Sequence, residues 1–293
     1  MSIAATQMPA TSPIPGRPRE IEAVSNTYLV HPVARWLVDR LVETTVTPNQ
    51  VSVASVAASA AAATCYVGLA WPWAAFVGLA FQFAWHVLDG ADGDLARRTG
   101  RASPRGELID GVCDHLSQAL IYIAFALVLQ SRLGPWAWAA AAAAGASHFV
   151  QANAYETGRK SYRHFVYGAP WMRQTGAGVG GLGAWLSALY LAVSTLSDPG
   201  EAEAQQAMDA AYAAGKAQSA RTLYRKRFVS LVKASGVLDS NTRTVAAFLA
   251  ILAGRPLWFF VFEFTVLNLA LAVIAATRLR ANRDFSARLR ALP

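Results

Sequence analysis

The chain carries few charged residues and almost no cysteine. Charged side chains make up 15% of its 293 residues and hydrophobic ones 54%, whereas about a quarter of the residues in an ordinary soluble domain are charged. This composition excludes a disordered chain and is too apolar for a soluble domain of this length. Two cysteines, Cys65 and Cys113, each lie in an apolar run, so neither a disulfide framework nor a zinc site is indicated.

Charge is missing altogether from residues 44–88. Because a spanning helix needs about 20 apolar residues, this run has room for two membrane helices, with a natural break at Trp71-Pro72-Trp73. Further runs with little or no charge cover 106–131, 133–155, 174–197 and 256–277. We therefore predict an all-α integral membrane protein, a helical bundle of six transmembrane helices.

Basic residues outnumber acidic ones by 26 to 18, and 22 of the 26 are arginine. In a chain this apolar, such an excess is typical of the cytoplasmic ends of membrane helices, and we expect no nucleic-acid partner. The arginines gather in residues 97–105, in residues 156–173 and in the tail from Arg278. We predict that these segments face the cytoplasm and that the protein lies in the inner, cytoplasmic membrane.

The segments outside the spans differ in character. Residues 1–25 are rich in proline and are predicted to form a disordered tail, ahead of a membrane domain over 26–293. Residues 26–45 have apolar side chains at helical spacing, which suits an amphipathic helix in the membrane interface, although an ordinary packed helix fits as well.

Residues 198–243 form a long loop whose side of the membrane is ambiguous. Six-span counting puts this loop outside, but its basic cluster favours the cytoplasm. The cytoplasmic side requires 244–254 and 256–277 to form a hairpin around Gly254-Arg255-Pro256, and the sequence leaves both options open.

Four aspartates stand where the second predicted span ends and the third begins. Asp89 and Asp92 are three residues apart and Asp110 and Asp114 four apart, so each pair lies on one face of a helix. Four carboxylates beside a bilayer are unfavourable unless a cation lies between them. Their hard oxygen atoms favour one or two divalent ions, Mg²⁺ or Mn²⁺, which usually also bind substrate phosphates.

Between the aspartates lie small residues and an arginine. Gly93 and Ala96 are small enough to let a nucleotide approach the helix backbone, and the Arg97 guanidinium can bind a pyrophosphate in a fork geometry. The full pattern is Asp89-x2-Asp92-Gly93-x2-Ala96-Arg97-x8-Gly106-x3-Asp110-x3-Asp114.

This pattern matches, at all eight fixed positions, the signature of the CDP-alcohol phosphatidyltransferase family. Thr47-Pro48-Asn49-Gln50 also resembles the way in which the family's chains lead into their first span. Elsewhere the chain is similar to the family in hydropathy alone, with a six-helix layout.

The resemblance implies a role for each signature position. The four aspartates would hold two divalent metal ions, and Asp110 and Asp114 are predicted to be catalytic, with Asp114 as the general base. Residues expected against the CDP moiety are Asp92, Gly93, Ala96, Arg97 and Gly106. Family members transfer a phospho-group from a CDP-linked donor to an alcohol and release CMP, and they are commonly dimers, so a homodimer is implied.

The fourth predicted span ends in a polar stripe at helical spacing. A polar stripe inside a span is unfavourable and indicates a cavity wall. We predict that His148, Gln151, Arg159 and Arg163 bind the acceptor alcohol. Interhelical hydrogen bonds are the competing interpretation.

The predicted function is transfer of a phosphatidyl group from CDP-diacylglycerol to a small polar alcohol in phospholipid synthesis, among membrane lipids. The alternative is transfer of a phospho-head-group from a CDP-alcohol to a lipid hydroxyl, because residues 26–32 loosely resemble the choline/ethanolamine phosphotransferase branch. A divalent-cation transporter is a remote third option. It predicts acids near the span centre, whereas these lie at the cytoplasmic ends.

Overall fold

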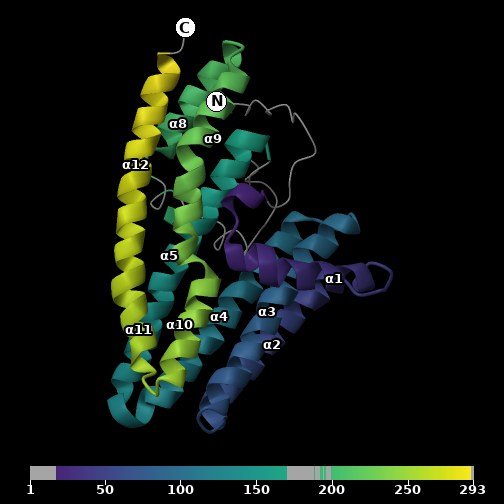
Figure 1. Cartoon of the computed structure of the whole chain (residues 1–293), viewed down its shortest axis with the longest axis vertical. Helices are drawn as coiled ribbons and strands as arrows, with labels where there is room; N and C mark the ends of the chain where they lie inside the picture. The colour runs from purple at the N-terminus through teal and green to yellow at the C-terminus, as the bar shows by residue number, and fades with distance from the viewer. Residues whose placement is uncertain (1–17, 170–187, 189–191, 194, 196–198, 292–293) are drawn as a thin grey trace. The chain divides into compact units, whose positions relative to one another are not determined.

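The computed structural model describes residues 18–169, 188, 192–193, 195 and 199–291. Every element in this part of the chain is a helix (Figure 1). In order they are η1 (Arg19–Ile21), η2 (Asn26–Val30), α1 (His31–Leu41), α2 (Pro48–Gly68), α3 (Trp73–Arg98), α4 (Pro104–Leu133), α5 (Pro135–Tyr167), α8 (Glu201–Ala213), α9 (Ala217–Ala234), η3 (Ser235–Leu238), α10 (Ser240–Leu252), α11 (Leu257–Phe262), η4 (Glu263–Leu267) and α12 (Asn268–Arg290).

Three of the described helical runs are long and apolar enough to cross a membrane: Pro48–Gly68, Arg105–Leu133 and Leu257–Arg290. The third run joins α11, η4 and α12. The predicted class, an all-α membrane bundle, is confirmed. The predicted span at 174–197 lies, apart from four positions, outside the described residues, and the number of six spans stays a prediction.

The chain divides into two compact units. The first unit comprises residues 23–149 and 240–266, and the second comprises residues 1–22, 150–239 and 267–293. All four signature aspartates belong to the first unit. The helices α5 and α11–α12 each continue from one unit into the other.

In the first unit, α3 and α4 pack against α2. Local sequence explains where two of these helices begin. The side chain of Thr47 accepts a hydrogen bond from the backbone N–H of Gln50, and the Gln50 side chain accepts one from the backbone of Thr47, which forms a capping box for α2. At α4, the Ser103 hydroxyl accepts a hydrogen bond from the backbone N–H of Gly106 at 3.1 Å.

The predicted amphipathic helix is present as α1, which lies across α2 and α3 (Figure 1). Its buried face contributes Ala34 and Val38 to an apolar cluster shared with α3. Other large apolar side chains of this segment stay exposed, including Tyr28 at 74% and Trp36 at 57%. An exposed apolar face is what a helix in a membrane interface needs.

Helices α10 and α11 form a hairpin, with a turn over residues 253–256. This is the arrangement that the sequence left open for the end of the chain. The hydroxyl of Thr244 in α10 contacts Gln82 and His86 of α3. At the other end of α10, the Trp71 indole N–H donates to the Leu252 carbonyl at 2.8 Å. The two contacts show that α10 runs antiparallel to α3.

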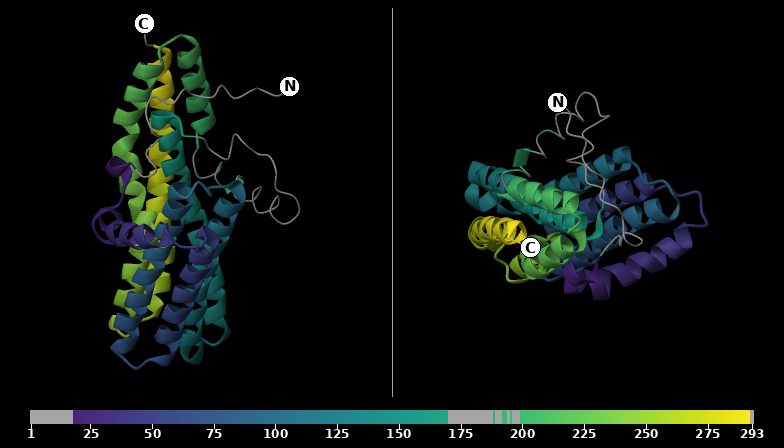
Figure 2. Two further views of the ribbon diagram at one scale, coloured as in Figure 1. Left: turned by 90° about the vertical axis from the view of Figure 1, so that its right-hand side faces the viewer. Right: turned by 90° about the horizontal axis from the view of Figure 1, so that it is seen from above.

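In the second unit, α8, α9 and α12 lie side by side (Figures 1 and 2) around a core of their own. Glu20 joins the segment before α1 to this unit, because its carboxylate accepts hydrogen bonds from Tyr162, Tyr167 and Arg225. Burial raises the pKa of Glu20, but the hydrogen bonds from the two tyrosines and the arginine outweigh it, so this pKa lies below its ordinary value.

Candidate active site

The signature aspartates meet where α3 ends and α4 begins. A five-residue connection, 99–103, turns the chain back, so that Asp89 on α3 faces Asp110 and Asp114 on α4. One carboxylate oxygen from each of these three side chains lies within 4.8 Å of the others. The three residues are half-buried. The structure therefore brings together three of the four residues that the sequence predicts as metal ligands in one cluster.

The fourth aspartate, Asp92, is more deeply buried, with 3% of its surface exposed. The Ser52 hydroxyl of α2 donates a hydrogen bond to Asp92 Oδ2 at 2.6 Å, and the backbone N–H of Gly93 donates to Asp92 Oδ1. Its carboxyl group also lies within hydrogen-bonding reach of Asp110. Two donors from the protein, the Ser52 hydroxyl and the Gly93 N–H, thus hold the carboxylate of Asp92.

The donor set fits a divalent cation. Carboxylates this close repel one another, and the repulsion is relieved when a cation binds between them. All the converging atoms are hard oxygens, which suit Mg²⁺ or Mn²⁺. His86 lies one turn before Asp89, but its Nε2 contacts the Thr244 hydroxyl at 2.9 Å, so the imidazole is occupied elsewhere.

The residues predicted to face CDP lie at the same end of α3 and α4. A Cβ placed on Gly93 would lie 3.4 Å from Nη1 of Arg97, and one on Gly106 would lie 3.3 Å from the Ser103 hydroxyl. Ala96 is half-buried. The Arg97 side chain is 43% exposed, and its guanidinium pairs with Asp94 at 3.2 Å, so it is accessible to a ligand. A Cβ at Gly93 would make an ordinary contact with a flexible side chain, whereas one at Gly106 would require a small shift of the Ser103 hydroxyl.

The four residues predicted for acceptor binding have varied surroundings. His148, in the first unit, packs against Tyr122, with ring centroids 5.8 Å apart. The other three belong to the second unit. The Gln151 amide donates to Asn268 at 2.8 Å, Arg159 pairs with Glu156 at 2.7 Å, and Arg163 is half-buried. The Gln151 contact is the interhelical hydrogen bond of the competing interpretation, and acceptor binding by these residues stays a prediction.

Two polar features of the first unit are not predicted from the sequence. Ser52 contacts Asp92, although it stands in a charge-free run whose signal is helix packing. Arg243 of α10 pairs with Glu263 of η4 at 3.1 Å, with side-chain exposures of 2% and 0%. The sequence feature that could have predicted this pair is Glu263, the lone acid in residues 256–277, because a buried charge requires a partner.

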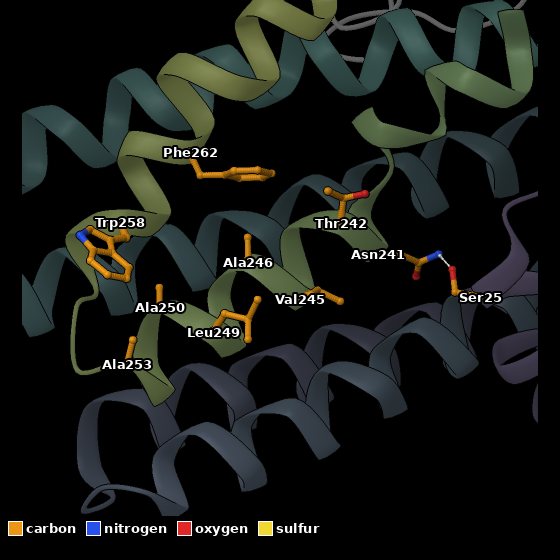
Figure 3. A pocket seen from close by; sticks show the side chains of 10 residues that line it. All are labelled: Ser25, Asn241, Thr242, Val245, Ala246, Leu249, Ala250, Ala253, Trp258 and Phe262. Carbon is orange, nitrogen blue, oxygen red and sulfur yellow. Dashed lines mark hydrogen bonds between the residues drawn. The ribbon is translucent and has the colours of Figure 1, made fainter.

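A groove of about 720 Å³ runs along α10 and α11 in the first unit (Figure 3). One end is polar, where the Asn241 amide donates to the Ser25 hydroxyl at 3.0 Å. The rest is apolar and extends past Leu249 to Trp258. Since α10 runs antiparallel to α3, and Thr244 contacts His86, the polar end of the groove lies toward the end of α3 that carries the aspartates.

The structure defines the class of the protein: an all-helical membrane bundle in which carboxylates from two helices converge at a candidate site for a divalent cation. A family model described as CDP-alcohol phosphatidyltransferase matches residues 45–197, just over half of the 293 residues. The chain belongs to the CDP-alcohol phosphatidyltransferase family.

Two curated relatives are similar over short segments. The chain is 44% identical over 64 residues to the uncharacterized CDP-alcohol phosphatidyltransferase class-I family protein 2 of Dictyostelium discoideum. The matched segment is 22% of this chain and 15% of that protein. The chain is 35% identical over 63 residues to cholinephosphotransferase 1 of Gallus gallus. Here the matched segment is 22% of this chain and 19% of that protein. The matches therefore span less than a fifth of either relative.

Proposed function

We propose that the protein transfers a phospho-group from a CDP-linked donor to a hydroxyl group and releases CMP. The observation that carries this proposal is the convergence of Asp89, Asp110 and Asp114 within a complete family signature. Together with Asp92, these residues would hold two divalent ions. Bound there, Mg²⁺ or Mn²⁺ would neutralise the diphosphate and the leaving CMP oxygen.

The other site residues act on the substrates. Arg97 binds the donor diphosphate through charge-assisted hydrogen bonds, and Gly93 and Gly106 leave space for the nucleotide to approach both helices. The acceptor oxygen forms a bond to the phosphorus that is transferred, while the bond from that phosphorus to the CMP oxygen breaks. The Asp114 carboxylate takes the proton of the attacking hydroxyl.

We further propose that one substrate is a lipid and that one of its acyl chains occupies the groove along α10. The polarity of the groove supports this occupant: polar atoms lie at the carboxylate end and apolar side chains beyond it, as an amphiphile requires. The volume is in the range of ligand pockets, about 300–1,000 Å³. Ala246→Trp, in the middle of the groove, should raise the Michaelis constant for the lipid several-fold. Val67→Trp, at an exposed position on α2, is the matched control.

Two kinds of CDP-linked donor are compatible with the proposed reaction. CDP-diacylglycerol, with a small polar alcohol as acceptor, is the donor we expect from the signature. The second candidate is a CDP-linked small alcohol with a lipid hydroxyl as acceptor. It is favoured by the resemblance of residues 26–32 to the choline/ethanolamine branch and by the similarity to a protein named cholinephosphotransferase.

We propose that the site faces the cytoplasm and that residues 199–239, which precede α10, lie on the same side. Helix α5 begins at the end of α4 remote from the aspartates and returns across the membrane. Its 33 residues extend about 50 Å, well beyond a hydrocarbon core of about 30 Å. Because α10 is antiparallel to α3, it starts again at the aspartate end. The arginine-rich segments then share one side, in agreement with the positive-inside rule.

The test is CMP release by the purified protein in detergent micelles. One set of reactions combines CDP-diacylglycerol with a panel of alcohols, and the other combines CDP-choline, CDP-ethanolamine or CDP-inositol with diacylglycerol. We expect release in one set, abolished by chelator and restored by Mg²⁺ or Mn²⁺. Absence of release with every donor, or release that persists in chelator, would contradict the proposal.

A further inference from the structure

Helix α2 carries three buried serines on the face that packs against α3 and α4. Ser52, Ser55 and Ser59 are 3%, 1% and 1% exposed. Their hydroxyls differ in partner: Ser55 donates to the Ser52 carbonyl of its own helix at 2.7 Å, and Ser59 donates to the Ser117 carbonyl of α4 at 2.7 Å. Ser52 donates to a signature carboxylate, Asp92, at 2.6 Å, and its hydroxyl also lies 3.3 Å from the Pro48 carbonyl of its own helix, which is the longer of the two contacts.

This contact fixes the orientation of Asp92. An ionised carboxylate offers about four acceptor positions on its two oxygens. The Ser52 hydroxyl takes one on Oδ2, and the backbone N–H of Gly93 takes one on Oδ1. With one donor on each oxygen, rotation of the carboxylate plane loses a hydrogen bond in a buried environment. The side chain of Asp110 also lies within hydrogen-bonding reach of Asp92, so the acceptor positions that Ser52 and Gly93 leave are next to the carboxylate cluster.

The position of Ser52 is itself fixed by the sequence around it. The capping box of Thr47 and Gln50 sets the first turn of α2. Val51 then packs in an apolar cluster with Ala91 and other residues of α3. Ser52 therefore follows a fixed helix start and a fixed packing contact, and its hydroxyl reaches Asp92 across 40 residues of sequence.

We propose that Ser52 is a positioning residue of the metal site, which sets the orientation of Asp92 for cation binding. The inference rests on the proposed function, since it assigns Ser52 to the metal site of that enzyme. Hydrogen-bond partners of metal ligands typically change metal affinity by about 10–100-fold when they are removed. We expect an effect of that size from Ser52→Ala.

The chain offers matched variants. Ser52→Thr keeps a hydroxyl at the same position and should retain near-normal affinity. Ser52→Cys keeps the volume but replaces the hydroxyl with a weak donor, so it should show a partial loss even if Ser52→Ala folds poorly. Ser55→Ala removes a hydroxyl of similar burial that bonds only its own helix, and it should leave metal affinity unchanged.

The experiment is a titration of the full-length, detergent-purified protein with Mn²⁺ alone, with free Mn²⁺ measured by electron paramagnetic resonance. Thermal unfolding in chelator, measured alongside, reports stability without metal. We expect a dissociation constant about 10–100-fold higher in Ser52→Ala than in wild type, with Ser52→Thr and Ser55→Ala close to wild type.

Two results would overturn the inference. If wild type binds Mn²⁺ and Ser52→Ala binds it equally well, Ser52 has no positioning role while the proposed function stands. If Ser55→Ala loses as much affinity as Ser52→Ala, the effect is one of helix packing. Absence of Mn²⁺ binding by wild type itself would remove the metal site and with it the proposed function.

Discussion

Neutralising one aspartate of the cluster should have opposite effects with and without metal. In the metal-free protein, Asp89 lies close to Asp110 and Asp114, with one oxygen of each within 4.8 Å of the others. Asp89→Asn keeps the shape of the side chain and removes one negative charge. We expect this variant to be more stable than wild type in chelator, and to lose most of the stabilisation that Mg²⁺ or Mn²⁺ gives to wild type.

The distances set the scale of the effect. Two unit charges 4.8 Å apart repel by about 3.5 kcal/mol at an effective dielectric constant of about 20. Asp89 faces two such partners, but solvent screening of half-buried groups and proton uptake reduce the repulsion. We therefore expect a gain of about 1–2 kcal/mol in chelator, which corresponds to about 2–8 °C in the unfolding midpoint.

Thermal unfolding of wild type and Asp89→Asn, each in chelator and in millimolar Mg²⁺, measures both effects, and CMP release measures activity. Asp94→Asn is the control. Asp94 pairs with Arg97 and Arg98 at 3.2 and 3.4 Å, so its neutralisation should give no gain in chelator and should leave the metal effect intact. If Asp89→Asn is destabilised in chelator, or keeps the full metal effect and full activity, the clustered carboxylates are not a cation site.

Three further outcomes are expected. Gly158→Ala should destabilise the protein by about 1–3 kcal/mol in thermal unfolding, because its Cβ would overlap the guanidinium of buried Arg278. Gly145→Ala, with open space around the Cβ, should be neutral or stabilising. Glu20→Gln should lower the unfolding midpoint at pH 7 by a few degrees. Because the folded-state pKa of Glu20 is depressed, its contribution to the free energy of unfolding is present above pH 4.5 and disappears as the pH falls through the folded pKa. The difference in unfolding midpoint between variant and wild type should therefore close in acid. Gln206→Cys, at an exposed position in a variant without other cysteines, should resist an impermeant thiol reagent in intact cells and react after permeabilisation. Labelling from outside would refute the cytoplasmic placement of residues 199–239.

The convergence of the aspartates follows from the sequence by simple geometry. Spacings of three and four residues place Asp89 with Asp92, and Asp110 with Asp114, on one face of a helix. In the structure, the five-residue connection 99–103 turns the chain back at this end of α3, and α3 and α4 each pack against α2. The local spacing of the aspartates does not involve the rest of the chain.

The path of the chain after α5 is harder to predict, and one ion pair explains much of the difficulty. Helix α10 has 13 residues and contains Arg243, so a search for long uncharged runs passes over it. Arg243 forms an ion pair with Glu263 of η4, 20 positions later in the sequence. A pairing between distant residues is invisible to a count of charges within one window.

The contact between Ser52 and Asp92 is likewise a pairing of residues distant in the sequence, which local patterns do not predict. Serines at positions 52, 55 and 59 fit the spacing of small residues at a helix interface, and this pattern predicts close packing of α2. Which of the three hydroxyls meets a carboxylate depends on the depth at which α2 sits against α3. That depth is set by side-chain packing and by the start of the helix at Thr47, which no periodicity in the sequence contains.

The pairing of Arg97 shows how the site can hold a cationic side chain ready for an anionic substrate. In the structure its guanidinium contacts Asp94, but the two side chains are 43% and 23% exposed. An exposed pair of this kind contributes about 0–1 kcal/mol, whereas a charge-assisted bond to a phosphate contributes about 1.5–3 kcal/mol. If the proposed donor binds here, its diphosphate would gain from displacing Asp94, and the loss to the protein would be small. Asp94 would then hold Arg97 in place without competing strongly with the ligand, as an acid inside the signature but outside its fixed positions can do.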